Sequence, residues 1–292
     1  MAAKDDARST PPPLPEPLAV AVADSHTHLD MQSGTPAEGL AKAASVGVTT
    51  VVQVGCDVPG SRWAAELAAQ YEQVHAAVAL HPNEAPRIFL GDADGWSGQQ
   101  RVAGGRAALD EALAEIDRLA ALPQVLAVGE TGLDYFRTGP EGVEIQKESF
   151  RRHIEMAKRH GKALVIHDRD AHEDVIAVLL EEGAPERTVF HCYSGDAEMA
   201  KTCAEHGWYL SFAGPVTFKA NQPLRDALLA TPPDRILVET DAPFLTPHPY
   251  RGRPNAPYLI PVTVRSMAAT LGLAEDELSA AIAENTARAF GY

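Results

Sequence analysis

The sequence predicts a single α/β domain with the (β/α)8 TIM-barrel fold and an active site at the C-terminal mouth of its strands. Three observations predict it. Eight short apolar runs recur along the chain, and segments with helical periodicity lie between them. This alternation is typical of a parallel sheet with crossover helices. The length of 292 residues also suits one barrel of roughly 250 residues with a short extension.

The predicted strands are rich in valine, isoleucine and leucine, as parallel strands buried on both faces are. They span residues 20–24, 49–54, 76–80, 124–129, 163–167, 187–191, 208–212 and 235–239.

Helices are predicted between these strands from apolar residues that recur every three or four positions. Phe150 and Ile154, for example, share one face of a helix, and Gly161 supplies a stop signal after it. The clearest such helices span 59–71, 143–160 and 278–290.

Two segments depart from the alternation. Residues 1–18 contain a proline cluster and acidic residues without the apolar stretch of a signal peptide, so we expect a flexible arm before a barrel domain over 19–292. Residues 91–106 contain five glycines and little apolar periodicity. We interpret them as an inserted loop before a helix that begins near Ala107.

The composition excludes several classes of protein. Hydrophobic residues make up 45% of the chain, which excludes a largely disordered protein. Lys and Arg number 25 against 40 Asp and Glu, and this net charge of −15 argues against a broad basic face that coats duplex DNA. No apolar run approaches the roughly 18 residues that a membrane span needs. Three cysteines without CxxC spacing suit a reducing cytoplasm.

Polar residues with metal-binding chemistry end six of the eight runs. In a parallel barrel these positions meet at the C-terminal mouth, where active sites of this fold lie. Imidazoles and carboxylates that converge there predict a metal site. The residues are His26 and His28 after the first run, His81 after the third, Glu130 after the fourth, His167 after the fifth, His191 after the sixth and Asp241 after the eighth.

The individual signals differ in strength. His26 and His28 lie on the same side of an extended strand because side chains alternate with period two, so both can bind one ion. A lone buried carboxylate is costly, and the two oxygens of Glu130 can bridge two ions. Taken singly, His167 or His191 is more often a core histidine; their coincidence at one rim favours the metal site. Histidines in helical patterns, such as His153, are interpreted as surface residues.

The combined motifs resemble the TatD family of metal-dependent deoxyribonucleases. The resemblance covers nearly the whole chain beyond residue 20, through the motifs DSHTHLD at 24–30, GETGLDYFR at 129–137, ALVIHDRDA at 163–171, HCYSG at 191–195, SFAGPVTFK at 211–219, ETDAPFLTPHPYRGRPN at 239–255 and NTARAF at 285–290. The family often has a second histidine after the His-Pro of the third strand, whereas Asn83 follows His81-Pro82 here.

The resemblance implies a TIM barrel, two divalent metal ions and hydrolysis of DNA phosphodiester bonds, with 3′–5′ exonuclease action on single-stranded DNA. It implies that one ion is bound by His26, His28, Glu130 and Asp241, and the other by Glu130, His167 and His191. Mg, Zn and Mn are the candidate ions.

The catalytic residues are expected to be Asp241 and Glu130, because a two-metal centre activates water directly and Asp241 can accept the proton of that water. A surface ion pair is an equal alternative for any single arginine in the mouth loops. The candidate substrate-binding residues are His81, Arg137, Arg169, Ser194, Lys219 and Arg251.

Two other functions stay open at this point. One is a small-molecule hydrolase of the same barrel superfamily, such as a phosphotriesterase or lactonase. Many of these use a carbamylated lysine as the bridging ligand, and no lysine lies between residues 120 and 140. The other is a non-catalytic metal or nucleic-acid binding module, which the complete set of six ligands disfavours. We expect a cytoplasmic monomer that acts on single-stranded DNA.

Overall fold

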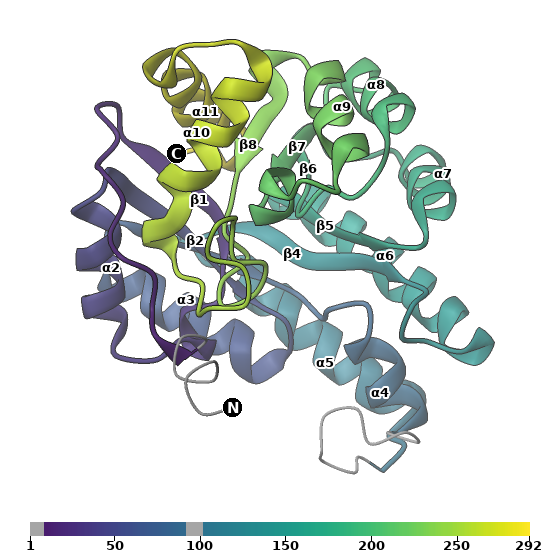
Figure 1. Cartoon of the computed structure of the whole chain (residues 1–292). Coiled ribbons are helices and arrows are strands. Elements are labelled where there is room, and N and C mark those ends of the chain that lie inside the picture. Colours follow the sequence, from purple (N-terminus) through teal and green to yellow (C-terminus); the bar gives the residue numbers. More distant parts are fainter. Residues whose placement is uncertain (1–8, 92–101) are drawn as a thin grey trace, which may run out of the picture. The chain divides into compact units, whose positions relative to one another are not determined.

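The computed structural model describes residues 9–91 and 102–292. Apart from the last two residues, the chain divides into two compact units, one of residues up to 53 together with 191–290, and one of residues 54–190. Eight parallel strands follow one another in the sheet in chain order, and at least one helix follows each strand (Figure 1). The predicted (β/α)8 fold class is confirmed.

In the unit of residues 54–190, four strands pair side by side in parallel from β3 to β6. They are β3 (Val74–Val78), β4 (Val125–Asp134), β5 (Ala163–Arg169) and β6 (Thr188–Phe190). The helices are α3 (Val58–Gln70), α4 (Glu84–Leu90), α5 (Gly105–Ala120), α6 (Pro140–His160) and α7 (His172–Glu182).

The other unit contains the first and the last strands of the chain. They are β1 (Val22–Thr27), β2 (Val48–Gly55, of which the last two residues belong to the unit of residues 54–190), β7 (Tyr209–Phe212) and β8 (Ile236–Val238). Its helices are α2 (Pro36–Ala44), α8 (Ala197–Glu205), α9 (Gln222–Ala230), α10 (Ile260–Leu271) and α11 (Glu275–Phe290), with short 3-10 turns at Leu29–Met31, Gly214–Thr217, Pro233–Arg235 and Pro257–Leu259.

The chain beyond β8 lies directly beside β1. Thr27 and Ala242 form a parallel bridge. The backbone N–H of His28 donates to the carbonyl of Ala242 at 2.9 Å, and that of Asp241 donates to the carbonyl of His26 at 3.0 Å. First and last strands are therefore joined, as closure of a barrel requires.

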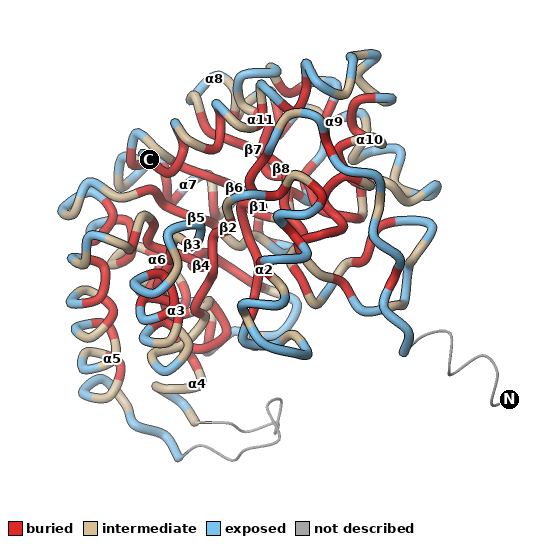
Figure 2. Tube along the Cα trace, turned by 90° about the vertical axis from the view of Figure 1, so that its left-hand side faces the viewer, coloured by how far each residue is buried: buried red, intermediate tan, exposed pale blue. Residues whose placement is uncertain are grey.

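The core is formed by strand residues and by the inner faces of the helices. Strand segments are mostly buried, whereas buried and exposed residues alternate around the helices (Figure 2). The largest fully buried side chains include Phe150 of α6, Phe190 of β6, Phe212 of β7 and Phe290 of α11.

Local sequence signals explain where several helices begin and end. Thr35 and Glu38 form a reciprocal capping box at α2, with Pro36 in the first turn. Asp196 caps α8 by accepting the backbone N–H of Met199. Gly161 ends α6 in the left-handed conformation (φ 61°), as the sequence predicts.

The structure describes only part of the two segments that depart from the predicted strand–helix alternation, residues 1–18 and 91–106. Of the Gly-rich segment 91–106, residues 92–101 lie outside the described residues, and α5 begins at Gly105, two residues before the predicted start. Residues 1–8 also lie outside them. The flexibility predicted for residues 1–18 stays a prediction, but Thr10, Glu16 and Leu18 of this stretch form hydrogen bonds with the rest of their unit. Within the described part of the chain, no helix is both long and apolar enough to cross a membrane.

Candidate metal centre

The first cluster of candidate ligands lies where β1 and β8 end. The Nε2 atoms of His26 and His28 are 3.3 Å apart. Asp241 Oδ1 lies 3.8 Å from Nε2 of His26 and 3.5 Å from Nε2 of His28. Both imidazoles are buried, while 14% of the Asp241 side chain is exposed. The structure therefore brings together the two histidines and the aspartate that the sequence predicts as ligands.

The spacing in this cluster fits a bound cation. Two atoms that each lie about 2.1 Å from one ion are separated by about 3.0–3.4 Å in octahedral or tetrahedral coordination. The imidazole nitrogens have this separation, and the carboxylate oxygen lies only slightly further away. Two imidazoles and one carboxylate suit Zn²⁺ or Mn²⁺, and the oxygen ligand also admits Mg²⁺.

The surroundings of Asp241 keep its carboxylate ionised. Burial alone would raise its pKa, but the hydrogen bond from His28 and the charges of His191 and His26 outweigh burial and lower the pKa below its usual value. The backbone of Asp241 has φ 51°, in the left-handed region that non-glycine residues rarely adopt. Such strained backbone persists where surrounding contacts hold it and is common at functional sites.

The buried carboxylate of Asp24, for which the sequence predicts no role, joins β1 to the residues after β8. Asp24 accepts hydrogen bonds from Thr240 Oγ1 at 2.5 Å and from the Thr240 backbone N–H at 2.9 Å. Complete burial raises the pKa of Asp24 to about 7 despite these bonds. Because Asp24 and Thr240 lie beside His26 and Asp241, this contact sets the two strand ends that carry the cluster against each other.

His191 lies in the same unit and stacks on His26. The ring centroids are 3.9 Å apart and the planes differ by 16°. His191 Nδ1 lies 3.2 Å from Glu239 Oε1, which also accepts the backbone N–H of Cys192 at 2.8 Å. Glu239 is fully buried. A carboxylate behind a metal-binding imidazole commonly fixes the ring and its tautomer, so Glu239 orients His191.

A second cluster lies along β4 and β5. Glu130 Oε1 is 2.7 Å from His167 Nδ1 and 3.4 Å from His81 Nε2. The other nitrogen of His167 is 3.2 Å from Oδ2 of Asp134. This unit therefore brings together the predicted ligands Glu130 and His167 with the candidate substrate residue His81, and it adds Asp134.

The path of β4 produces this arrangement. Its predicted apolar run ends at Gly129, but the strand continues to Asp134 with a register shift against β5 between Val128 and Thr131. Gly132 has φ 135°, and a Cβ there would lie 2.1 Å from the carbonyl oxygen of His167. Only glycine permits this close approach, which keeps Glu130 and Asp134 beside His167.

Besides its contact with His167, Asp134 is held by donors from two segments. Asn83 Nδ2 donates to it at 2.9 Å, and the backbone N–H groups of Phe136 and Arg137 donate at 3.0 and 3.2 Å. Burial would raise its pKa, but the hydrogen bonds from His167 and Asn83 outweigh it and lower the pKa to about 2. Asn83, where the sequence departs from the family pattern, therefore orients Asp134.

The interpretation of His153 as a surface residue is wrong. His153 of α6 is fully buried, accepts the backbone N–H of Leu80 on Nε2 at 3.1 Å, and contacts the carbonyl oxygen of Ser149 through Nδ1 at 2.7 Å. Burial lowers its pKa to about 4, so the ring is neutral. His153 thus anchors the segment that carries His81. The sequence does contain a signal for this burial. His153 lies three residues after Phe150 and one before Ile154, which places it on the apolar face of the helix.

Comparison with known proteins identifies the family to which these clusters belong. The family model described as "TatD related DNase" matches residues 23–291. The chain belongs to the TatD family. Relatives include an uncharacterized metal-dependent hydrolase, TatD, of Mycobacterium tuberculosis, which is 42% identical over 92% of this chain and 97% of that protein. Another is YabD of Bacillus subtilis, also named as a metal-dependent hydrolase, which is 36% identical over 91% of this chain and 98% of that protein.

Solved structures agree with this membership. The crystal structure of the TatD homologue YjjV from Escherichia coli K12 matches with a TM-score of 0.79 and 25% identity, over 93% of this chain and 98% of that one. A TatD-family hydrolase from Entamoeba histolytica matches in fold, with a TM-score of 0.76 and 18% identity, over 94% of this chain and 99% of that one. The chain is a metal-dependent hydrolase of the TatD family with the TIM-barrel fold.

Most candidate substrate-binding residues of this TatD-family chain are exposed. Arg169 stacks its guanidinium 3.8 Å above the ring of Phe136, and Arg251 lies 4.6 Å above that of Phe218. His81 is half-buried in the second cluster. Arg137, Ser194 and Lys219 are exposed side chains.

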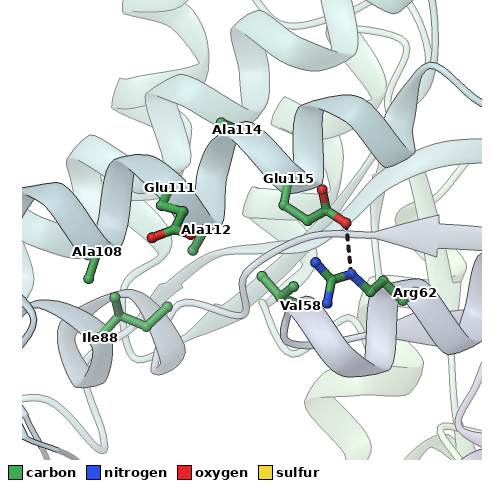
Figure 3. A pocket seen from close by; sticks show the side chains of 8 residues that line it. All are labelled: Val58, Arg62, Ile88, Ala108, Glu111, Ala112, Ala114 and Glu115. Atoms are coloured by element: carbon green, nitrogen blue, oxygen red, sulfur yellow. Dashed lines mark hydrogen bonds and ion pairs between the residues drawn. The ribbon is translucent and has the colours of Figure 1, made fainter.

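Two further features concern a cysteine beside the second cluster and a hollow between helices. The Cys56 thiol is 3.7 Å from Glu130 Oε2, which places it at the rim of the second cluster. A hollow between α3, α4 and α5 is lined by Ile88, Ala108, Glu115 and their neighbours, with Arg62 paired to Glu115 (Figure 3). None of the predicted site residues lines this hollow.

Proposed function

We propose that this chain is a divalent-metal-dependent deoxyribonuclease that removes nucleotides from the 3′ end of single-stranded DNA. The family model carries a DNase description. The single observation that supports the proposal most is the presence of two histidine–carboxylate clusters, each at the C-terminal ends of barrel strands.

The proposed ligands follow the family pattern. His26, His28 and Asp241 hold one ion, as their spacing in the first cluster supports. His167 and His191 hold the other. The assignment of Glu130 as the ligand common to both ions rests on the sequence motif. Mg²⁺, Mn²⁺ and Zn²⁺ are the candidate ions.

When bound, two divalent ions supply positive charge for the phosphate oxygens and lower the pKa of the attacking water. The chain's own residues then complete the reaction. Asp241, ionised and partly exposed, accepts the proton of that water. Glu239 holds the His191 ring in place. Arg169, at the end of β5, and Arg251, in the loop after β8, each present a guanidinium that can bind phosphate oxygens.

The experiment is digestion of 3′- and 5′-labelled single- and double-stranded oligonucleotides with Mg²⁺, Mn²⁺ and Zn²⁺ in parallel. A panel of small phosphotriesters and lactones runs beside it, and chelator-treated protein is the control. We expect metal-dependent release of mononucleotides from the 3′ end of single strands. Strong lactone or triester hydrolysis without DNA cleavage would instead support a small-molecule hydrolase, and metal binding without any turnover would support a binding module.

We also propose that the chain is a monomer and lies in the cytoplasm; the sparse cysteines without CxxC spacing support this compartment. Size-exclusion chromatography with light scattering tests the oligomeric state, and fractionation of the native cells tests the compartment.

A further inference from the structure

The segment that precedes the first strand docks on residues that follow the last one. Arg253 donates from Nε to the carbonyl of Thr10 at 2.8 Å and from Nη2 to that of Pro11 at 2.6 Å. The buried Tyr258 hydroxyl donates to the carbonyl of Pro12 at 2.7 Å. These three carbonyls are consecutive, so one short stretch of the arm is bound by two side chains.

A second contact fastens the arm closer to β1. Arg265 Nη2 donates to the carbonyl of Glu16 at 2.9 Å, and its Nε pairs with Glu275 at 2.6 Å. The buried Leu18 donates its N–H to the carbonyl of Val46 at 3.1 Å. Proline-rich backbone is extended, has no internal hydrogen bonds and offers its carbonyls to such donors. We define residues 9–18 as the strap.

The strap reaches a loop that carries candidate substrate residues. Residues 244–255, the mouth loop, follow Asp241 and contain Arg251 and Arg253. Asn255 donates to the carbonyls of Thr240 at 2.9 Å and Phe244 at 2.5 Å, and this fixes the two ends of the loop together.

A second side of the mouth loop packs on the turn after β7. The backbone N–H of His248 donates to Thr217 Oγ1 at 2.8 Å. Gly214 approaches so closely that a Cβ there would lie 1.9 Å from the carbonyl oxygen of Leu245. Arg253 is the residue of the loop that binds the strap, and its backbone carbonyl accepts the Thr246 hydroxyl at 2.6 Å. The strap is thus a further support for the loop.

The contacts also separate the roles of two arginines. The Arg253 guanidinium donates its hydrogen bonds to carbonyls of the strap. The guanidinium of Arg251, in contrast, is exposed and lies over the ring of Phe218. Arg253 therefore holds the loop, and Arg251 remains available to an anionic substrate.

We infer that the strap is a positioning element for substrate binding: by holding Arg253 and Tyr258 it keeps the mouth loop, and with it Arg251, in the conformation that binds the phosphate backbone. For its kinetic consequence this inference rests on the proposed nuclease function. The match to the TatD family model begins at residue 23. The strap therefore precedes the part of the chain that matches the family.

The test compares two truncations of the full protein. Deletion of residues 2–13 removes the carbonyls bound by Arg253 and Tyr258, and deletion of residues 2–8 is the matched control. Tyr258→Phe removes one donor and keeps the ring, with Tyr71→Phe at the end of α3 as its control. Two measurements are made on each variant: amide hydrogen exchange of the mouth loop, and steady-state kinetics on an oligonucleotide and on bis(p-nitrophenyl) phosphate.

We expect the 2–13 deletion to speed exchange at the His248 and Arg253 amides and to raise KM for the oligonucleotide about five-fold, the effect of losing roughly one hydrogen bond. The kcat on the small diester should stay within about two-fold of the control, because that substrate does not reach Arg251. General destabilisation would lower turnover on both substrates. Tyr258→Phe should shift exchange in the same direction by a smaller amount.

Equal exchange in the 2–13 and 2–8 deletions would overturn the inference, and so would faster exchange with unchanged KM for the oligonucleotide. If the wild type cleaves no DNA, the proposed function fails, and the inferred effect on nucleic-acid binding fails with it. The exchange comparison then still decides whether the strap holds the loop.

Discussion

Asp241 combines an unusual backbone conformation, an ionised carboxylate and a position beside two buried imidazoles. It has a left-handed φ, a lowered pKa and two imidazoles within 3.8 Å of one carboxylate oxygen. Asp241→Asn removes the proton acceptor and weakens the ligand set, so kcat should fall by about 100-fold or more. Steady-state hydrolysis with saturating Mn²⁺ measures this. Asp234→Asn, in the turn before β8, is the control, and a variant Asp241→Asn with turnover near that of the control would contradict the assigned role.

His153 makes the stability of the fold depend on pH. Its pKa is about 4 in the folded protein and about 6.5 when unfolded. A depressed pKa means that the unfolded state takes up the proton first, so the stabilisation is fully present above pH 6.5 and is lost as pH falls toward 4. Between pH 7 and 4.5 the free energy of unfolding should drop by about 2–3 kcal/mol more in the wild type than in His153→Gln.

Urea unfolding at the two pH values measures this difference. His248→Gln, at an exposed position of the mouth loop, should keep the pH dependence of the wild type. Identical pH dependence in His153→Gln and the wild type would show that the buried ring is not the source.

The strand-end positions of the candidate ligands can be predicted from the sequence, but the residues that orient these ligands cannot. His26, Glu130 and Asp241 follow apolar runs, so their place at strand ends is predictable. Asp24 and Glu239 are also next to predicted strand ends, yet which partner each carboxylate meets depends on strand register and on side chains distant in the chain. Composition and periodicity carry no such information.

At the scale of single elements, α5 shows which contacts hold a helix of this barrel in place. Leu113 and Ile116 are fully buried on one face. On the outer side Asp117 pairs with Arg159 at 2.5 Å and with His160 at 2.7 Å, both on α6. Ile116→Ala should cost about 2–5 kcal/mol, because a cavity replaces packed side-chain atoms. Asp117→Asn should cost less than about 1 kcal/mol, because water and salt screen an exposed pair.

Denaturant unfolding of the two variants checks this order, with 0.5 M salt as the second condition. Added salt should reduce the small effect of Asp117→Asn and leave that of Ile116→Ala unchanged. A larger loss of unfolding free energy in Asp117→Asn than in Ile116→Ala would contradict this prediction.

The helices and strands themselves were largely predictable, and their ends were less so. The repeat of Phe150 and Ile154 locates α6, and Gly161 marks its end. The extension of β4 past Gly129 to Asp134 was not predicted, because Glu130, Thr131 and Asp134 are polar and the apolar run stops before them. They remain in a strand because their hydrogen bonds to β5 continue, and this pairing is non-local.

For the whole molecule, metal binding should be coupled to thermal stability. A ligand that binds only the folded state, present at a concentration 100 times its dissociation constant, raises the free energy of unfolding by about 2.7 kcal/mol. For a chain of this size that corresponds to a rise in Tm of about 4–5 °C. Calorimetry of chelator-treated protein with and without added Mn²⁺ measures it. Asp241→Ala should show a smaller rise, and equal Tm values with and without metal in the wild type would argue against a cation site.

The bridge between Thr27 and Ala242 joins residues from opposite ends of the chain, and this has a consequence during synthesis on the ribosome. His26 and His28 emerge early, but Asp241 and the segment that pairs with β1 emerge more than 200 residues later. Until then one edge of β1 has no strand to pair with, and the nascent chain exposes an apolar strand edge. The three candidate ligands of the first cluster therefore come together only after the chain has been made as far as Ala242.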